Sequence, residues 1–213
     1  MSLINRRAPV LALALAVLGC SNPGVVLQWQ SYAAQHVALR KVAVVPLSAS
    51  SFFVPGQPPN DIDGATAADL MGRFLTEAIA ERGQSVVAPS DLALAFATAG
   101  REVQRDDPGA VAELAAAKFS ATGILLGSVS RYRERSGEAL GALHPAGVAF
   151  EVTLYAAPGG EKLWGARFDE TQQAFMDNPL KARRYPGGGT RWLRAAELAR
   201  WGADQVAKVL FTP

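Results

Sequence analysis

The feature that most constrains the fold is a set of three long strand patterns in the second half of the chain. The middle pattern, residues 147–156, reads GVAFEVTLYA. Its apolar set, Val148, Phe150, Val152 and Leu154, alternates with Ala149, Glu151, Thr153 and Tyr155. Such alternation predicts a strand with one face in the core and the other turned away from it. Segments 122–135 and 161–172 flank this strand, and a turn at 158–160 joins the last two, so we expect an antiparallel meander.

The first half of the chain alternates strand and helix signals. Residues 41–47, KVAVVPL, form a continuous β-branched run that predicts a central strand ending near Pro46. A helix is predicted over 65–82, because Asp63 can cap its start and apolar residues recur on one face. That face holds Ala67, Leu70, Met71, Phe74, Leu75 and Ala78. Further signals predict a short strand within 84–89 and helices at 89–100 and 106–118.

The remaining segments complete the expected fold. Residues 48–62 contain several prolines and predict a loop, and residues 176–189 show no regular period. A last helix is predicted over 191–211, with Trp192, Ala195, Leu198, Ala199, Gly202, Val206 and Val209 on its inner face. We therefore expect an α/β (α+β) fold in a single domain over 41–213. Its mixed sheet contains the meander of three long strands, with helices packed on it and a C-terminal helix.

The N-terminus carries the signals of an exported, lipidated protein. Arg6 and Arg7 precede the apolar run VLALALAVLG, a pattern typical of a secretory signal peptide, which we assign to residues 1–19. The following stretch, Val17-Leu18-Gly19-Cys20, resembles a lipobox, in which the cysteine is acylated and becomes the first mature residue. The resemblance implies palmitate on Cys20 and a membrane anchor. In such lipoproteins a serine after the cysteine permits sorting to the outer membrane, and Ser21 stands there.

Charge and cysteine content narrow the possible partners. Without Arg6 and Arg7, the 21 basic residues fall to 19, which equals the 19 acidic residues of the chain. A neutral mature chain argues against a nucleic-acid partner, because nucleic-acid binding draws on a basic excess. Cys20 is the only cysteine, so no intrachain disulfide can form and the fold must be stabilised by its own core. Residues 20–40 lack a sustained period and predict a tether that contributes at most a short helix or a clasping strand.

No group of residues in the sequence has the spacing of a catalytic or metal site. The histidines, His36 and His144, lie far apart without ligand spacing, and Asp61, Asp63 and Asp69 lack the rest of a calcium loop. The glycines at 187–189 precede Thr190 without the strand and lysine of a phosphate-binding loop, so Thr190 is better explained as a helix N-cap. Asp169 and Glu170 are neighbours on a strand and should point to opposite faces. We therefore expect no enzyme activity, no cofactor and no bound metal.

Two groups of residues are candidates for partner binding. Arg131, Arg133 and Arg135 alternate along one strand, and Arg183 and Arg184 lie in the basic segment 181–186. They could meet an acidic partner or an anionic glycan, although charges on an edge strand also serve to prevent aggregation. Phe52 and Phe53, in the proline-rich loop, could anchor a partner protein or pack under the domain.

The order of elements resembles a group of bacterial envelope domains. The lipobox and tether are followed by KVAVVPL, by a helix ending in ERG before a VV strand, by ATGILLGSVSRY and by the turn AAPGGEKLW. These features resemble the curli-secretion lipoprotein CsgG, the N-terminal domain of TolB and the LpoB-like activators of penicillin-binding proteins, over residues 41–173. The resemblance implies a domain without catalytic activity that assembles with or regulates envelope machinery.

Two functional hypotheses follow from the sequence. In the first, the chain is an outer-membrane lipoprotein facing the periplasm, which binds or scaffolds an envelope protein partner. In the second, it is a periplasmic hydrolase or a small-ligand or glycan-binding protein, with a cleft between the loops 48–62 and 187–190. A deep pocket lined by convergent polar groups would favour the second hypothesis, and a shallow surface with exposed Phe52 and Phe53 would favour the first.

Overall fold

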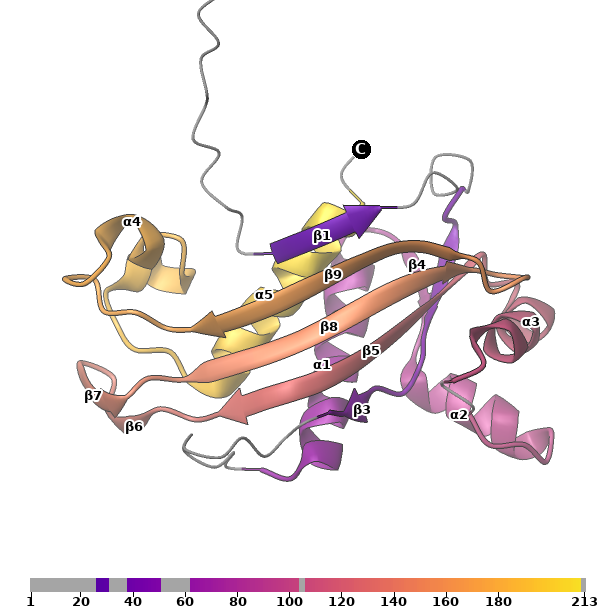
Figure 1. The fold of residues 1–213 in the computed structure, drawn as a ribbon, viewed down its shortest axis with the longest axis horizontal. Helices are drawn as coiled ribbons and strands as arrows, with labels where there is room; N and C mark the ends of the chain where they lie inside the picture. The colour runs from indigo at the N-terminus through magenta and orange to yellow at the C-terminus, as the bar shows by residue number, and fades with distance from the viewer. Residues whose placement is uncertain (1–25, 31–37, 51–61, 104–105, 212–213) are drawn as a thin grey trace, which may run out of the picture.

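The computed structural model describes residues 26–30, 38–50, 62–103 and 106–211 (Figure 1). The predicted signal peptide, the lipidation site Cys20 and the sorting residue Ser21 lie outside these ranges. So do His36 and the predicted partner-binding residues Phe52 and Phe53. These assignments remain predictions.

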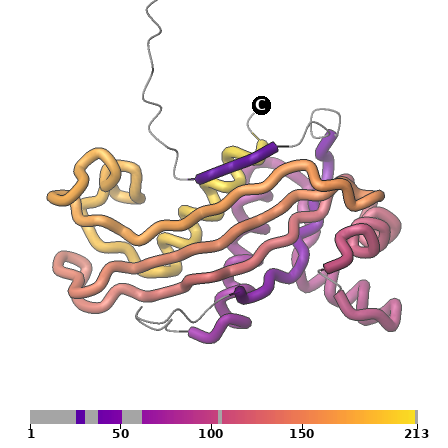
Figure 2. Tube along the Cα trace, in the orientation of Figure 1, coloured from indigo at the N-terminus to yellow at the C-terminus, as the bar shows by residue number. Residues whose placement is uncertain are grey.

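A mixed sheet forms the centre of the fold, as the sequence predicts. Its strands are β1 (Val26–Gln30), β2 (Lys41–Val44), β3 (Ser48–Ala49), β4 (Ser85–Val87), β5 (Gly123–Arg133), β8 (Gly147–Ala156) and β9 (Lys162–Thr171). The strand order is β1-β9-β8-β5-β2-β4, and β3 pairs with β5 beyond the end of β2. Strands β5, β8 and β9 pair antiparallel in the expected meander, whereas β2 pairs parallel to both β4 and β5. The three long strands run along most of the molecule (Figure 2).

The alternation in β8 has the predicted consequence. Val148, Phe150, Val152 and Leu154 all belong to the main apolar core. On the other face, Glu151 is exposed and Thr153 and Tyr155 are half-buried. Ala149 also lies on that face but is buried. The period of two therefore separates the core face of the strand from its other face on sequence grounds alone.

The main helices begin and end near the positions that the sequence predicts. They are α1 (Gly64–Glu81), α2 (Pro89–Thr98), α3 (Pro108–Phe119) and α5 (Ala195–Leu210). Asp63 caps α1, because its carboxylate accepts a hydrogen bond from the Thr66 N–H at 3.0 Å. Asp107 caps α3 in the same way through the N–H of Ala110, also at 3.0 Å. All the predicted inward residues of α1 are buried except Leu70, which is half-buried.

The helices cover the two faces of the sheet unequally. Helices α1 and α5 pack on one face, over the main core (Figure 1). Helices α2 and α3 pack on the opposite face, but only at the end formed by β2, β4 and the start of β5, where a second apolar cluster lies. Within the described part of the chain, no helix covers the rest of that face, which β1, β9, most of β8 and the second half of β5 form.

Of the two elements allowed within the predicted tether, the structure contains the strand: β1 pairs antiparallel with β9 and forms the edge of the sheet. Two other segments differ from the sequence expectation. The predicted strand over 41–47 ends at Val44, because Pro46 has no N–H to continue the ladder, and pairing resumes as β3. The segment between β5 and β8 forms a small hairpin of β6 (Ser136–Glu138) and β7 (Gly141–His144).

The predicted C-terminal helix also starts later than expected. Before α5 the chain forms the short helix α4 (Pro179–Ala182) and the 3₁₀ helix η2 (Pro186–Gly189). Helix α5 begins at Ala195 instead of residue 191, so Thr190 is not its N-cap, and that interpretation was wrong. The Thr190 hydroxyl donates instead to the carbonyl of Gly187 at 3.0 Å and closes a local turn.

Gly202 sets how closely α5 approaches the sheet. A Cβ atom at this position would lie 2.8 Å from Phe168 and 3.0 Å from Phe150, two rings on adjacent strands. We predict that Gly202→Leu lowers the free energy of unfolding by about 1–3 kcal/mol through overpacking, despite the better helix propensity of leucine. Chemical denaturation should show this loss, while Ala196→Leu, on the exposed side of α5, should leave stability nearly unchanged. Equal stabilities for the two variants would contradict the prediction.

Candidate functional site

The β6–β7 hairpin and α4 lie at the same end of the molecule (Figure 1). The segments at this end carry exposed apolar side chains. We call this group the terminal apolar surface, formed by Leu140, Leu143, Phe175, Met176 and Leu180. Leu140 and Met176 are each 87% exposed and Leu143 is 82% exposed. Single exposed apolar residues are common, but several from separate segments at one place indicate an interaction surface.

The hairpin is fixed to the segment that precedes α5. The backbone N–H of Trp192 donates to the carbonyl of Ala139 at 2.8 Å, which joins the hairpin turn to that segment. Gly137 adopts a φ of 93° and lies against the backbone of β7, where a side chain would clash with the Gly141 carbonyl. The leucines of the hairpin are therefore presented on a folded element.

A buried carboxylate holds α4 against the end of β9. Glu170 is only 3% exposed, and its Oε1 accepts from the Tyr185 hydroxyl and pairs with Lys181 Nζ, each at 2.8 Å. Burial and the hydrogen bond to the Glu170 carboxylate together raise the pKa of Tyr185, so this hydroxyl stays protonated as a donor. Lys181 lies on α4 and Tyr185 follows it by a few residues, so Glu170 holds both α4 and the residues after it.

A buried glutamine adds a second attachment. The Gln172 side chain accepts from the Leu193 N–H at 2.6 Å and donates to the Arg191 carbonyl at 2.8 Å. Asn178 also caps α4 by accepting from the N–H of Lys181 at 3.0 Å. The buried Gln172 side chain therefore joins the start of the segment between β9 and α5 to its end. Such anchoring presents Phe175, Met176 and Leu180 with little further ordering cost on binding.

A small hollow lies within this surface. It measures about 150 Å³ and its lining includes Leu140, Phe175, Met176 and Trp192, together with Gly189 and Thr190. The glycines of η2 have φ values of 77°, 69° and 75° at positions 187, 188 and 189. Gly189 also approaches the Ala182 carbonyl so closely that a Cβ would lie 2.5 Å from the oxygen. The glycine run therefore serves a tight turn against α4.

The first predicted arginine group is only partly brought together. Arg131 and Arg133 lie on the face of β5 away from α1 and α5, and both approach Gly147 of β8. Arg131 donates to Asp169 Oδ1 at 2.5 Å, and Arg167 donates to Oδ2 at 2.8 Å. Burial raises the pKa of Asp169, but the bonds from Arg167 and Arg131 outweigh this effect and lower it overall. Arg131, one of the arginines predicted to bind a partner, is thus paired with Asp169 of another strand of the same sheet.

The other predicted arginines lie on separate elements. Arg135 follows the end of β5, and its guanidinium donates to the Gly137 carbonyl at 3.3 Å within the hairpin. Arg183 is exposed at the C-terminal end of α4 and Arg184 is half-buried beside it. A role of these arginines in partner binding remains a prediction.

The structure places the residues that the sequence analysis considered as catalytic or metal-binding candidates. Asp169 and Glu170 point to opposite faces of β9, as predicted, since one is exposed and the other buried. In the described ranges no cluster of three histidine, cysteine, aspartate or glutamate residues could hold a metal. A groove of about 720 Å³ runs between α1 and α2, with Leu47, Gly72 and Pro89 in its lining. The second hypothesis places one cleft between the loops 48–62 and 187–190. Pro46 and Leu47, which precede the first loop, line the groove between α1 and α2, whereas Gly189 and Thr190 of the second loop line the terminal hollow.

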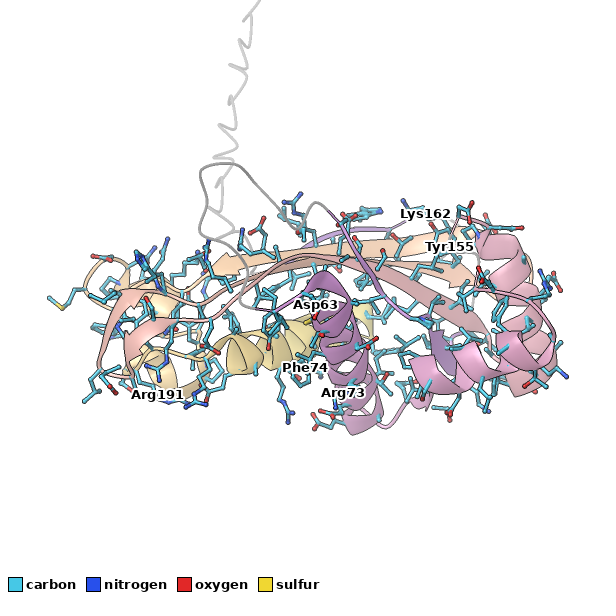
Figure 3. The ribbon with its side chains drawn as sticks, turned by 90° about the horizontal axis from the view of Figure 1, so that it is seen from below. Asp63, Arg73, Phe74, Tyr155, Lys162 and Arg191 are labelled. Atoms are coloured by element: carbon cyan, nitrogen blue, oxygen red, sulfur yellow. The ribbon has the colours of Figure 1, made fainter. Side chains whose placement is uncertain are left out.

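Figure 3 shows labelled residues at the two ends of the domain. Tyr155 and Lys162 lie on the sheet face opposite α1 and α5, whereas Arg191 lies at the other end of the molecule. None of the described helices is both long enough and apolar enough to cross a membrane.

Sequence reasoning missed the terminal apolar surface. Its residues lie in segments without a regular period, so no hydrophobic face could be assigned to them. The available signal was the presence of Leu140 and Leu143 in a short glycine-containing segment, and of Met176 and Leu180 around Pro179. Large apolar residues in predicted turns are candidates for contacts outside the domain.

Comparison with known proteins gives similarity at the level of fold. No protein-family model matches the sequence, and no curated protein matches it. The PelC dodecamer from Paraburkholderia phytofirmans is 18% identical with a TM-score of 0.50, covering 88% of this chain and 97% of that chain. At this identity the similarity concerns the fold.

Two further solved structures have lower TM-scores. Lipoprotein GNA1162 from Neisseria meningitidis is 18% identical, with a TM-score of 0.41 and coverage of 67% of this chain and 92% of that one. The LpoB C-terminal domain from Salmonella enterica is 18% identical, with a TM-score of 0.38 and coverage of 64% and 85%. An LpoB domain is thus among the similar structures, whereas the resemblance to CsgG and TolB stays a prediction.

An ion pair beside the terminal hollow makes the start of α5 sensitive to acid. Arg191 donates two hydrogen bonds to Glu197, the Arg194 N–H donates a third at 2.9 Å, and the pKa of Glu197 falls to about 2, chiefly because of Arg191. A carboxyl with a lowered pKa stabilises the fold above its ordinary value of 4.5 and loses this effect as the pH falls towards 2. We predict that Glu197→Gln lowers stability by about 0.5 kcal/mol at pH 7, a small value because the pair is partly exposed.

Denaturation at several pH values tests this prediction. The difference between wild type and Glu197→Gln should shrink between pH 4.5 and 2. Glu113→Gln is the matched control, since Glu113 is exposed on α3. A difference that stays constant over this window would contradict the assignment.

Proposed function

We propose that this chain is a membrane-anchored lipoprotein that acts as a non-catalytic binding or scaffolding component of a cell-envelope assembly. The observation that carries the proposal is the terminal apolar surface. Its residues are large, exposed and supplied by two separate segments of the chain. Buried polar contacts at Glu170 and Gln172 fix one of these segments. A rigid apolar surface of this kind is typical of a protein–protein interface.

The anchor is the lipid on Cys20. A single cysteine directly after the apolar signal run supports acylation there, and Ser21 supports sorting to the outer membrane with the domain facing the periplasm. The neutral charge balance of the mature chain supports a protein partner over nucleic acid.

We further propose that the assembly contains several copies of this chain. PelC, which has the same fold over most of its length, was solved as a dodecamer. The terminal apolar surface supplies the contact that such self-association needs. A heterologous contact of this kind closes into a ring when the rotation between neighbours permits it.

The anchor is tested by cell fractionation. We predict that Cys20→Ser releases the processed protein from the membrane fraction into the soluble fraction, because the acyl chains supply the stable membrane attachment. Immunoblots of both fractions measure the change, and Ser21→Ala serves as the neighbouring control that retains the acylated residue. Persistence of Cys20→Ser in the membrane fraction would refute the lipid anchor.

The binding surface is tested on the detergent-solubilised lipoprotein. We predict that the double variant Leu140→Ser/Leu143→Ser reduces self-association at least tenfold, because it removes exposed apolar contact area. Light scattering or native mass spectrometry measures the assembly relative to the mass of one processed, lipidated chain.

Leu94→Ser is the matched control for this experiment, since Leu94 is 67% exposed on α2, away from the hairpin. This control should leave the assembly intact. If the double variant and the control assemble equally well, the terminal apolar surface is not the contact between copies.

A further inference from the structure

A second exposed apolar group lies on the edge strand β1, outside the terminal apolar surface. Leu27 is 62% exposed and Trp29 is 43% exposed. Their register partners on β9 are Arg167 and Gly165, so both side chains lie on the sheet face that α1 and α5 do not cover. We call Leu27, Trp29 and the neighbouring Lys162 the β1 face.

The indole of Trp29 is held in one position by its neighbours. It lies directly over Gly165, where a Cβ would come within 2.3 Å of the ring. The ammonium of Lys162 lies 5.5 Å from the ring centroid, within the range of a cation–π contact. Position 165 must be glycine, because any larger residue would occupy the space of the indole. The ring therefore rests directly on the backbone of β9.

The β1 face lies close in sequence to the predicted lipid attachment. Val26 starts β1 six residues after Cys20, and Leu27 and Trp29 follow at seven and nine residues. A fully extended chain spans at most about 3.3–3.6 Å per residue, so the start of β1 lies within roughly 20 Å of an acylated Cys20. A folded domain on so short a connection must place the nearby edge of its sheet close to the bilayer.

We propose that the β1 face lies against the membrane to which Cys20 anchors the chain. This inference rests on the lipid anchor of the proposed function. Tryptophan is enriched at membrane interfaces, where its apolar ring and polar N–H suit the headgroup region, and lysine reaches from there to lipid phosphates. Leu27 adds an apolar side chain beside the ring.

Apolar contact, and not a basic patch, carries this interaction. Arg167 shares the face with Leu27, but it is paired with Asp169, and Glu151 stands opposite it on β8. Glu161 also precedes Lys162 and is exposed. Because these charges nearly balance, contact with the lipid surface should depend weakly on salt.

The β1 face leaves the terminal apolar surface free for protein contacts. Trp29 is level with Gly165 of β9, and Gln172, which lines the terminal hollow, comes seven residues later along the chain. At about 3.3 Å per residue along a strand, the two sites are separated by roughly 20 Å. A chain anchored along β1 can therefore bind a partner at its end.

Tryptophan quenching distinguishes the two surfaces in the lipidated protein. The protein, purified from membranes, is reconstituted into phosphatidylethanolamine–phosphatidylglycerol vesicles with or without brominated acyl chains. Trp29 reports on the β1 face, and Trp192, which lines the terminal hollow, reports on the other end. We expect bromine-dependent quenching that Trp29→Phe largely removes and Trp192→Phe leaves in place.

Variants without a lost fluorophore complete the test. Leu27→Ser should weaken the quenching of Trp29, whereas Leu94→Ser on α2 should not. Quenching that is absent in the anchored wild type, or that survives in Trp29→Phe and disappears in Trp192→Phe, would overturn the proposal. Failure of the wild-type protein to float with the vesicles would instead refute the lipid anchor and the proposed function.

Discussion

The packing of α5 on the long strands is the contact on which the rest of the structure depends. Gly202 lets the helix approach Phe168, which stacks on Phe150 of the neighbouring strand with ring centroids 5.3 Å apart. Trp201 meets Phe168 edge-on at 5.8 Å and also meets Tyr185 at 5.3 Å. Because the Tyr185 hydroxyl then bonds to Glu170, this row of rings connects the sheet, the last helix and the segment that bears part of the terminal apolar surface. Dispersion and apolar burial thus position the groups proposed for binding.

The unequal covering of the sheet explains where exposed apolar groups can occur. One face is sealed by α1 and α5, and α2 and α3 cover only one end of the other. The uncovered part of the second face is mostly polar or ion-paired, through Arg131, Arg167 and Asp169. Against that background, Leu27 and Trp29 at the edge and the leucines of the hairpin are exceptions, and they are the groups for which we propose contacts with the membrane and with another protein.

Most of the fold could be predicted because its elements carry their own signals. The alternation in β8, the caps Asp63 and Asp107 and the proline after β2 are local features that act within a few residues. The candidate binding surface could not be predicted in the same way. Phe52 and Phe53 stand on sequence grounds alone, and Arg131 proved to be engaged with Asp169, because pairing across strands depends on the sheet register and not on spacing within one strand.

The sequence by itself determined the main helices, the long strands and the buried faces of α1 and β8, because these depend on periodicity and capping, and a short local motif predicts lipid attachment at Cys20. Only the tertiary structure decided that β1 joins the sheet at β9, placing Trp29 over Gly165, and that the hairpin and α4 meet at one end. These juxtapositions join residues far apart in the chain. They arise from packing that leaves some apolar side chains without a place in the core, and no local pattern encodes that outcome.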